Sequence, residues 1–271
     1  AVDDELKDYL DAEANTPALK LDGSPALPFE FATKDATAEY NANTAVETAA
    51  EHAEIQNEQF TIENMRYVVD VMAACIIKNE VPFCELDAHA GDGDFGMSVA
   101  KGFKQLKREW QSLIQTQHMD EFLLNSSMII MEHCGGASGP IWGSAFRAAS
   151  KAIQGKSTLT VSDFAEMLQA AVKGIQVTGE RSFGRGAVVG DKTLIDALVP
   201  CAYSWSANTH KTFKENFVLS AAAAVKGAES TKDIVARMGR AGTVGDRSLG
   251  YHDAGAHGLG VIFTDIAEHI K

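Results

Sequence analysis

Apolar residues recur at helical spacing along most of the chain. After Thr61, a plausible N-cap, one helical face carries Ile62, Met65, Val68, Val69, Met72 and Ile76. Val81-Pro82 is predicted to end this helix, because proline disrupts a helix interior. The same spacing predicts helices at about 97–114, 120–133, 140–153, 162–178, 193–207, 212–238 and 256–270. Since no segment alternates convincingly with the period of a strand, we expect an all-α fold, an antiparallel bundle or barrel of eight helices.

Glycines gather in four of the loops between these predicted helices, 91–96, 135–139, 184–190 and 239–258. The four loops join helices one and two, three and four, five and six, and seven and eight. In an up-and-down arrangement, alternate loops lie at the same end of the molecule. The pattern therefore predicts one composite site formed by the four loops at one mouth.

Residues 1–58 lack this helical spacing, so we divide the chain into a leader, 1–58, and a helical domain, 59–271. Residues 3–10 could form a short acidic helix, whereas 14–57 are rich in Ala, Thr, Glu, Asn and Pro. Such a composition buries little apolar surface, so a loosely ordered linker is expected. A tail that docks on a partner is the alternative.

The negative charge is concentrated in this leader. The first 60 residues hold fourteen acidic residues against three lysines, which leaves −2 of the net −13 to the rest of the chain. No basic stripe appears, so nucleic-acid binding gains no support. No apolar run approaches the roughly 18 residues of a membrane helix, and no secretory signal is evident.

The four cysteines are widely spaced and form no CxxC pair. This spacing argues against a zinc site and a disulfide framework for Cys75, Cys84, Cys134 and Cys201. Free thiols in a reducing cytoplasm are therefore expected.

The most informative chemistry lies in Leu86-Asp-Ala-His-Ala-Gly-Asp-Gly-Asp-Phe-Gly96. Asp87, Asp92 and Asp94 fall within eight residues, and carboxylates packed this closely repel one another unless a cation lies among them. Glycines allow sharp backbone turns, so the three side chains can converge. Mg²⁺ is the expected ion, because it combines a few carboxylates with phosphate oxygens.

Two other interpretations of this motif are open. Asp-Gly-Asp segments also occur in ordinary surface turns. A calcium-binding EF-hand fits less well, because Phe103 stands where such a loop needs a bidentate glutamate.

The second and third loops carry candidate anion-binding groups. Gly135-Gly-Ala-Ser-Gly139 precedes Pro140, a favoured first helical residue, and exposed N–H groups at a helix start bind anions. Ser138 adds a hydroxyl donor, although a tight turn that only packs helices is the alternative. In the third loop, Asp191 and Lys192 are interpreted as a helix cap and a surface charge. The glycines flanking Arg185 favour a loop that faces a ligand.

The fourth loop, Met238 to Gly255, is too long and glycine-rich for a simple connection. Arg240 and Arg247 have planar guanidinium groups suited to phosphate oxygens. His252 and His257 are expected to be solvated, without a catalytic role.

With these loops in place, the chain over residues 60–271 resembles the L subunit, or L domain, of dihydroxyacetone kinases. The resemblance rests on Leu-Asp-x-x-x-Gly-Asp-Gly-Asp, Gly-Gly-x-Ser-Gly-Pro, Gly-Asp-Lys-Thr-x-x-Asp-Ala-Leu and Gly-Arg-Ala-x-x-x-Gly-x-Arg-Ser-x-Gly, in this order. It implies an eight-helix barrel that holds ATP or ADP at one end through two Mg²⁺ ions. The implied magnesium ligands are Asp87, Asp92 and Asp94. The implied nucleotide contacts are Phe95, Gly96, Met97, Ser98, Ala137, Ser138, Gly190, Val199, Arg240, Asp253, Ala254 and Gly255.

Three departures from the family pattern affect these contacts. Phe95 stands where the family usually has His, Ala137 where it has Thr, and Asp253-Ala-Gly255 where it has Asp-Pro-Gly. The lost donors at the first two positions are expected to weaken phosphate contacts by about 1–3 kcal/mol each.

The leader resembles the tail of a K domain that runs into an interdomain linker. The implied activity is phosphoryl transfer from ATP to a small hydroxyketone held by a K domain or subunit, so the chain is expected to be active only with that partner. Ser138 would hold the terminal phosphate, Arg240 would steady the nucleotide phosphates, and the three aspartates would hold the metal. Alternatives are an L subunit that retains ADP and is rephosphorylated by a phosphotransferase-system protein, and a nucleotide-loaded regulatory module. A homodimer is also possible.

Overall fold

The computed structural model describes residues 14–15, 20–21, 44–239 and 241–271. The short helix expected at 3–10, and Arg240 with its expected role, lie outside the described residues. Contacts divide the chain into two units, 1–39 and 40–271. In the first unit, β1 (Ala14–Asn15) and β2 (Lys20–Leu21) pair antiparallel.

The described part of the second unit is built from α-helices and short 3₁₀ turns. The α-helices are α3 (Ile62–Lys78), α4 (Glu80–Ala90), α5 (Phe95–Arg108), α6 (Trp110–Leu113), α7 (Met119–His133), α8 (Ser138–Ala152), α9 (Val161–Phe183), α10 (Ile195–Ala207), α11 (Phe213–Ser230) and α12 (Ala254–His269). The 3₁₀ turns are η1 (Ala50–Ala53), η2 (Gln56–Glu58), η3 (Thr231–Asp233), η4 (Ala241–Thr243) and η5 (Gly245–Ser248).

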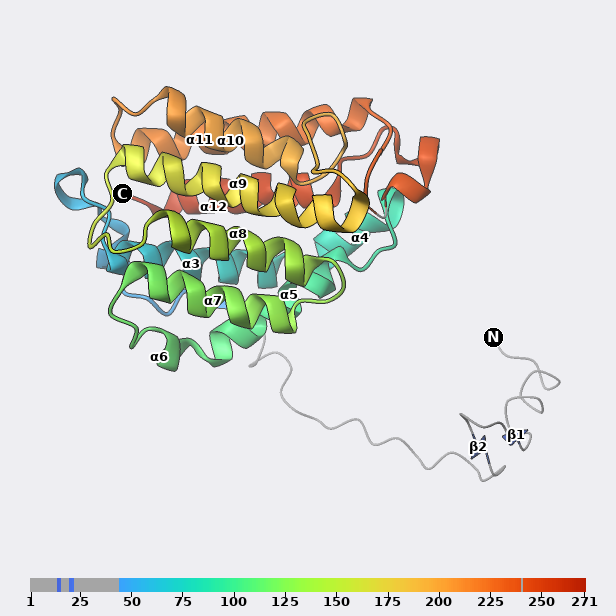
Figure 1. The fold of residues 1–271 in the computed structure, drawn as a ribbon, viewed down its shortest axis with the longest axis horizontal. Helices are drawn as coiled ribbons and strands as arrows, with labels where there is room; N and C mark the ends of the chain where they lie inside the picture. The colour runs from blue at the N-terminus through green and yellow to red at the C-terminus, as the bar shows by residue number, and fades with distance from the viewer. Residues whose placement is uncertain (1–13, 16–19, 22–43, 240) are drawn as a thin grey trace. The chain divides into compact units, whose positions relative to one another are not determined.

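Eight of these helices form a closed ring. In order around the ring, α3, α5, α7, α8, α9, α10, α11 and α12 each contact the next, and α12 returns to contact α3 (Figure 1). Their inward faces share one apolar core, as amphipathic helices require. The prediction of an all-α fold is confirmed, and the ring is an eight-helix barrel.

Several helix boundaries differ from those predicted; α9, for example, runs to Phe183, past its predicted end at about 178. α3 ends at Lys78 and a separate helix, α4, begins at Glu80 with Pro82 in its first turn. Proline is tolerated there because N–H groups of a first turn have no partner within the helix. The helix expected at 97–114 breaks at Glu109 into α5 and α6, and the one expected at 212–238 ends at Ser230.

An aromatic cluster closes one end of the barrel core. Phe60, Phe164, Trp205, Phe213 and Phe217 pack with ring centroids 4.4–5.9 Å apart. These residues lie at the starts of α3, α9 and α11 and the end of α10. This end is therefore opposite the glycine-rich loops.

A buried ion pair fixes residues 44–58 to the barrel. The Asp70 carboxylate of α3 accepts hydrogen bonds from the N–H groups of Glu47 and Thr48, at 2.8 and 2.7 Å, and pairs with Lys107 of α5 at 2.6 Å. A buried charge needs such partners. These bonds hold Glu47 and Thr48 against α3, and the expectation of a loosely ordered leader stays a prediction.

Two sequence expectations can be compared with the described helices and thiols. No helix in the described part of the chain is long and apolar enough to cross a bilayer. All four cysteines are free, as expected, and burial raises the pKa of the Cys75 and Cys201 thiols to about 12 and that of Cys134 to about 11. These three thiols are therefore inert at neutral pH.

Candidate functional site

The carboxylates of Asp87, Asp92 and Asp94 converge in the loop that follows α4. Asp87 lies in the last turn of α4, Asp92 in the following loop, and Asp94 immediately before α5. One ligand atom from each lies within 4.8 Å of the others. The predicted convergence of the three aspartates is therefore present.

Backbone N–H groups orient the Asp87 carboxylate. Its Oδ2 accepts hydrogen bonds from Gly93, Asp94 and Phe95, at 2.9, 3.1 and 3.2 Å. Burial raises the pKa of Asp87, these hydrogen bonds oppose that rise, and the nearby Asp94 carboxylate adds to it. A divalent cation would relieve both the burial cost and the repulsion.

Two glycines in this loop serve different purposes. Gly93 has φ +80°, a conformation that favours glycine. Gly91 has an ordinary negative φ, but a β-carbon there would overlap Asp87 Oδ1. The motif therefore needs glycine for close approach as well as for turning, which an ordinary surface turn does not require.

The three carboxylates fit Mg²⁺ in number and spacing. Mg²⁺ binds oxygen at about 2.0–2.1 Å, so ligands on opposite sides of one ion lie about 4 Å apart. Atoms within 4.8 Å of one another reach one ion, or a close pair, with small side-chain movements. The remaining coordination positions are available for water or phosphate oxygens.

The second glycine loop lies against the first turn of α5, which follows the first loop. The Gly135 N–H donates to the Ser98 carbonyl of α5 at 2.9 Å, and a β-carbon on Gly135 would press against Ser98. α8 then begins at Ser138 without a side-chain N-cap, and Ala137 before it is exposed. The Ser138 N–H donates to the Gly135 carbonyl at 3.1 Å and Pro140 has no N–H, so the donors that the first turn of α8 can offer an anion are the Gly139 N–H and the Ser138 hydroxyl.

The third loop is organised by two buried aspartates. Asp191 accepts two hydrogen bonds from the Arg185 guanidinium, at 2.5 and 2.8 Å, and this pairing lowers the pKa of Asp191. Asp196 accepts from the N–H groups of Gly190 and Thr193, at 2.6 and 2.8 Å. The Arg185 guanidinium is therefore paired within its own loop, and the expectation that this loop faces a ligand stays a prediction.

Lys192 is fully buried, so its interpretation as a surface charge was wrong. A sequence pattern cannot identify its partners, which are backbone carbonyls 42 to 59 residues further along the chain.

The fourth loop brings Asp253 towards the other carboxylates. Asp253 is the N-cap of α12 and accepts from the Ala256 N–H at 2.7 Å. Burial raises the pKa of Asp253 to about 7, and the negative charges of Asp196 and Asp87 add to that rise. Asp253 therefore lies within electrostatic reach of both the first and the third loop.

One acidic neighbour and one ring contact correct the prediction that His252 and His257 are solvated. His252 Nε2 lies 3.0 Å from Glu229, and its ring packs against that of His257 with centroids 5.0 Å apart. Burial, followed by the neighbouring His252, lowers the pKa of His257. In addition, Tyr251 stacks on His89 of α4 at 4.5 Å, which joins the fourth loop to the first.

Phe95 is half-buried and packs against the core. Its ring lies 5.9 Å from that of Phe83, and a β-carbon on Gly258 of α12 would touch it. The side chain at the position of the family's histidine therefore contributes packing between α4, α5 and α12.

The other predicted contact residues lie around the same mouth with different exposures. Met97 is exposed, Gly190 and Val199 are half-buried, and Gly96, Ser98, Ala254 and Gly255 are buried. Arg247 is exposed within η5. Besides Lys192, sequence reasoning missed Asp196 and Thr231, whose hydroxyl accepts from the Asp253 N–H at 2.9 Å. Only Asp196 had a signal, its place in the Gly-Asp-Lys-Thr-x-x-Asp segment.

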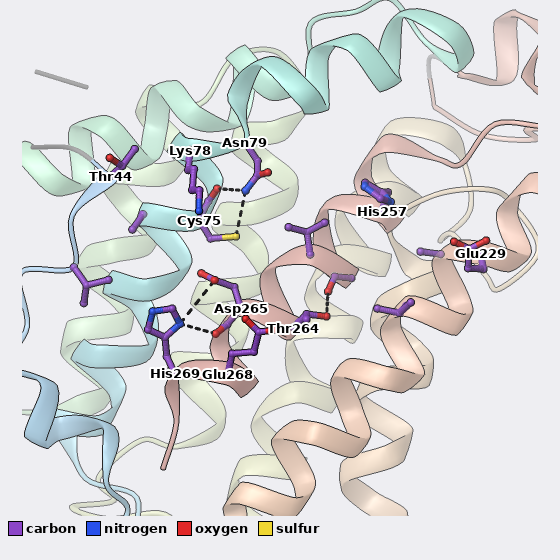
Figure 2. Close-up of a pocket in the computed structure, with 16 residues that line it drawn as sticks. Thr44, Cys75, Lys78, Asn79, Glu229, His257, Thr264, Asp265, Glu268 and His269 are labelled. Atoms are coloured by element: carbon purple, nitrogen blue, oxygen red, sulfur yellow. Dashed lines mark hydrogen bonds and ion pairs between the residues drawn. The ribbon is translucent and has the colours of Figure 1, made fainter. Parts of the chain in front are cut away.

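A separate groove of about 470 Å³ lies on the outside of the barrel, between α3, α11 and α12. Figure 2 shows basic Lys78 and His269 in it together with acidic Asp265 and Glu268. None of the residues predicted to bind metal or nucleotide lines this groove. Because the groove carries charges of both signs, it indicates no particular class of ligand. The mouth with Asp87, Asp92 and Asp94 is therefore the candidate site.

A comparison with protein families identifies the chain. The DAK2 domain model matches residues 89–268. The chain belongs to the DAK2 domain family. The ADP-binding subunit of PEP-dependent dihydroxyacetone kinase 2 from Listeria innocua is 30% identical over 207 residues, which cover 76% of this chain and 93% of that protein.

Two longer kinases match most of the chain. The L-erythrulose 1-kinase of Mycolicibacterium smegmatis is 27% identical over 99% of this chain, which covers 45% of that protein. The crystal structure of the C. freundii dihydroxyacetone kinase with AMP-PNP and Mg²⁺ matches 79% of this chain and 36% of that one, with a TM-score of 0.55 and 24% identity. The chain thus spans less than half the length of these two kinases.

Proposed function

We propose that this DAK2 domain is the nucleotide- and magnesium-binding half of a dihydroxyacetone-type kinase, which transfers the terminal phosphoryl group of ATP to a small hydroxyketone. The hydroxyketone would be held by a K domain or subunit, so this chain alone would not turn over. The observation that carries the proposal is the convergence of Asp87, Asp92 and Asp94 at the mouth formed by the four glycine loops.

The direction of the helices supports an anion site at this mouth. α5, α8, α10 and α12 all begin there, because each follows one of the four loops. Helix N-termini carry partial positive charge, and free N–H groups at their starts hydrogen-bond phosphate oxygens. The metal carboxylates and the helix starts together suit a nucleotide whose phosphates bridge the two.

Each group at the mouth has a distinct proposed role. Asp87, Asp92 and Asp94 bind magnesium, two ions in this proposal, and Asp87 is oriented for this by three N–H groups. Ser138 and the start of α8 hold the terminal phosphate, and Arg240 holds the nucleotide phosphates. When bound, Mg²⁺ neutralises the charge that develops on the transferred phosphoryl group. The protein's part is to position groups and stabilise charge, so it needs no nucleophilic side chain.

The relatives favour ATP as the donor. The alignment with the M. smegmatis kinase includes the leader, since it covers 99% of the chain, whereas that with the Listeria subunit covers 76%. A leader shared with long single-chain kinases supports a link between a K domain and this domain. An ADP-retaining subunit is the second candidate, supported by the Listeria relative, 93% of whose length is matched.

The first experiment identifies the nucleotide. The purified protein, kept in Mg²⁺, is denatured and the released nucleotide is analysed by chromatography, after which MgATP and MgADP binding is measured by calorimetry. We expect an empty protein that binds MgATP reversibly. Stoichiometric released ADP would instead support the retained-cofactor alternative, and no binding under either condition would contradict the proposal.

A pair of aspartate variants tests the metal site. Asp92→Asn should abolish MgATP binding and any kinase activity reconstituted with a K partner, because it removes a metal ligand. Asp120→Asn is the matched control, since Asp120 begins α7 at the opposite end and accepts from the Gly155 N–H at 3.2 Å. Hydroxyketone phosphorylation by the chain alone would contradict the division of labour. A partner effect that survives Asp92→Asn would favour the regulatory alternative.

A further inference from the structure

Lys192 joins two of the four loops through one buried ammonium group. Its side chain is 0% exposed, and Nζ donates to the carbonyl oxygens of Ile234, Ser248 and Tyr251, at 3.1, 2.5 and 2.8 Å. A lysine ammonium has three N–H donors, so these three carbonyls use all of them. Lys192 therefore has no donor left for a phosphate oxygen.

The three acceptors lie at the two ends of one segment. Ile234 is near the start of segment 234–251, and Ser248 and Tyr251 are near its end, so a single ammonium closes the segment into a loop. The Ser248 hydroxyl accepts from the Ala236 N–H at 3.1 Å and closes the same two ends a second time. The closed segment carries Arg240 and leads directly into Asp253.

The backbone at Lys192 is also held in place by hydrogen bonds of its neighbours. Lys192 has φ +62°, an uncommon conformation for a residue with a side chain. Its neighbour Asp191 pairs with Arg185, and the Asp191 carbonyl accepts from the Arg237 N–H at 3.0 Å. Such a conformation persists only where the surroundings determine it, and it is found most often at functional sites.

We infer that Lys192 is a positioning residue for the nucleotide site: it holds the two ends of segment 234–251 together and so fixes the start of α12, with Asp253 as its N-cap, at the mouth. This inference rests on the proposed function, because it assumes that the mouth binds nucleotide. Lys192 acts through the loop and does not touch the ligand.

The chain contains a matched control lysine at the opposite end of the barrel. Lys214 Nζ donates to the carbonyl oxygens of Ala267, in the last turn of α12, and of Ile270, its C-cap. Lys192 and Lys214 therefore make the same kind of bond, from an ammonium to backbone carbonyls, but only Lys192 makes it at the mouth. Loss of stability alone would affect both variants in the same way.

The test compares Lys192→Met with Lys214→Met in the full chain. MgADP affinity is measured by calorimetry, amide hydrogen exchange of segment 234–251 by mass spectrometry, and stability by urea unfolding. For Lys192→Met we expect MgADP affinity to fall by at least tenfold, and by up to the order of 100-fold, as displaced binding groups typically cause. We also expect faster exchange confined to this segment. Lys214→Met should change stability without changing MgADP affinity.

A milder variant covers the case in which Lys192→Met does not fold. Ser248→Ala removes only the second closure, so it should shift exchange and affinity in the same direction by a smaller factor. Wild-type affinity in a folded Lys192→Met protein, or in Ser248→Ala with unchanged exchange, would overturn the inference. If the wild-type protein does not bind MgADP, the proposed function fails. Exchange in segment 234–251 of the Lys192 variant then still shows whether Lys192 holds the loop.

Discussion

The helix termini at the two ends of the barrel are stabilised by different interactions. At the end opposite the mouth, α3, α9 and α11 begin with capping boxes, in which Thr61, Thr160 and Thr212 exchange hydrogen bonds with residues three positions later. The aromatic cluster lies beneath these starts. The capping boxes at this end satisfy the protein's own backbone N–H groups, and the aromatic cluster buries the protein's own apolar surface.

The mouth leaves more of its hydrogen-bonding capacity for a ligand. α5 and α8 begin there without a side-chain N-cap, and the first N–H of α5 donates to Asp87, one of the metal-binding candidates. Carboxylates with raised pKa values, Asp87 and Asp253, also lie here. At the mouth, by contrast, carboxylates lie within electrostatic reach of one another, and a bound cation would neutralise their like charges.

Trp205→Ala should produce the largest effect on stability and none on binding. Trp205 is 1% exposed, and its ring lies 4.4 Å from that of Phe164. Removal of a buried aromatic side chain costs about 3–5 kcal/mol of unfolding free energy. Urea unfolding measures this loss, and calorimetry of the folded variant should give unchanged MgADP affinity. A large loss of affinity in the folded variant would show that the two ends are not independent.

The charge of Asp253 should make the metal-free mouth sensitive to pH. Its pKa is raised from 3.8 to about 7, so between these values the folded state keeps a proton that the unfolded chain has lost. Stability should therefore fall as pH rises from about 4 to 7, by at most about 1.4 kcal/mol per pH unit, and level off above 7.

Asp253→Asn removes this titration, and asparagine still caps a helix. Urea unfolding in EDTA should show that the variant's stability advantage over the wild type grows from pH 4 to pH 7. Parallel pH profiles for the two proteins would show that Asp253 is not held in an unfavourable charged state.

Gly91→Ala should damage the mouth with little effect on the fold. The added β-carbon would overlap Asp87 Oδ1 and displace that carboxylate. Displacement of a metal ligand is expected to lower MgADP affinity by about 10- to 100-fold. Gly179→Ala in α9 is the control, because its β-carbon would meet neighbours no closer than 3.7 Å. Equal affinities for the two variants would exclude Asp87 from the binding site.

Removal of one hydroxyl at each end should give the smallest effects, in different measurements. Thr212→Ala removes a capping box and should lower the unfolding free energy by about 1 kcal/mol, without an effect on MgADP binding. Ser138→Ala should leave stability nearly unchanged and weaken MgADP binding by about 1 kcal/mol, the net value of a hydrogen bond. The reverse pattern would contradict the assignment of the two ends.

The helical spacing predicted the fold class because apolar faces that recur every three or four residues must be buried somewhere. It failed at Pro82, Glu109 and Ser230, where a helix restarts, breaks or ends for reasons outside its own apolar pattern. The fourth loop is longer than predicted because the segment after Ser230 is bound to Lys192 and Ser248.

In the candidate site, too, the sequence predicted the features that depend on short chain distances but not those that depend on tertiary packing. Asp87, Asp92 and Asp94 are close in the chain, so glycine spacing was enough to predict that they converge. Phe95 could be noted as a departure, but its inward packing against Phe83 depends on α4, a helix that the sequence analysis did not predict.

By itself, the sequence determined the properties that depend on short chain distances: the helical periods, the end at which the glycine loops meet, and the acidic metal motif. Only the tertiary structure decided which charges are buried and what they bind. Lys192 shows the reason. Its three acceptors lie 42, 56 and 59 residues away in the chain, and only the closed ring of helices brings them within hydrogen-bonding distance.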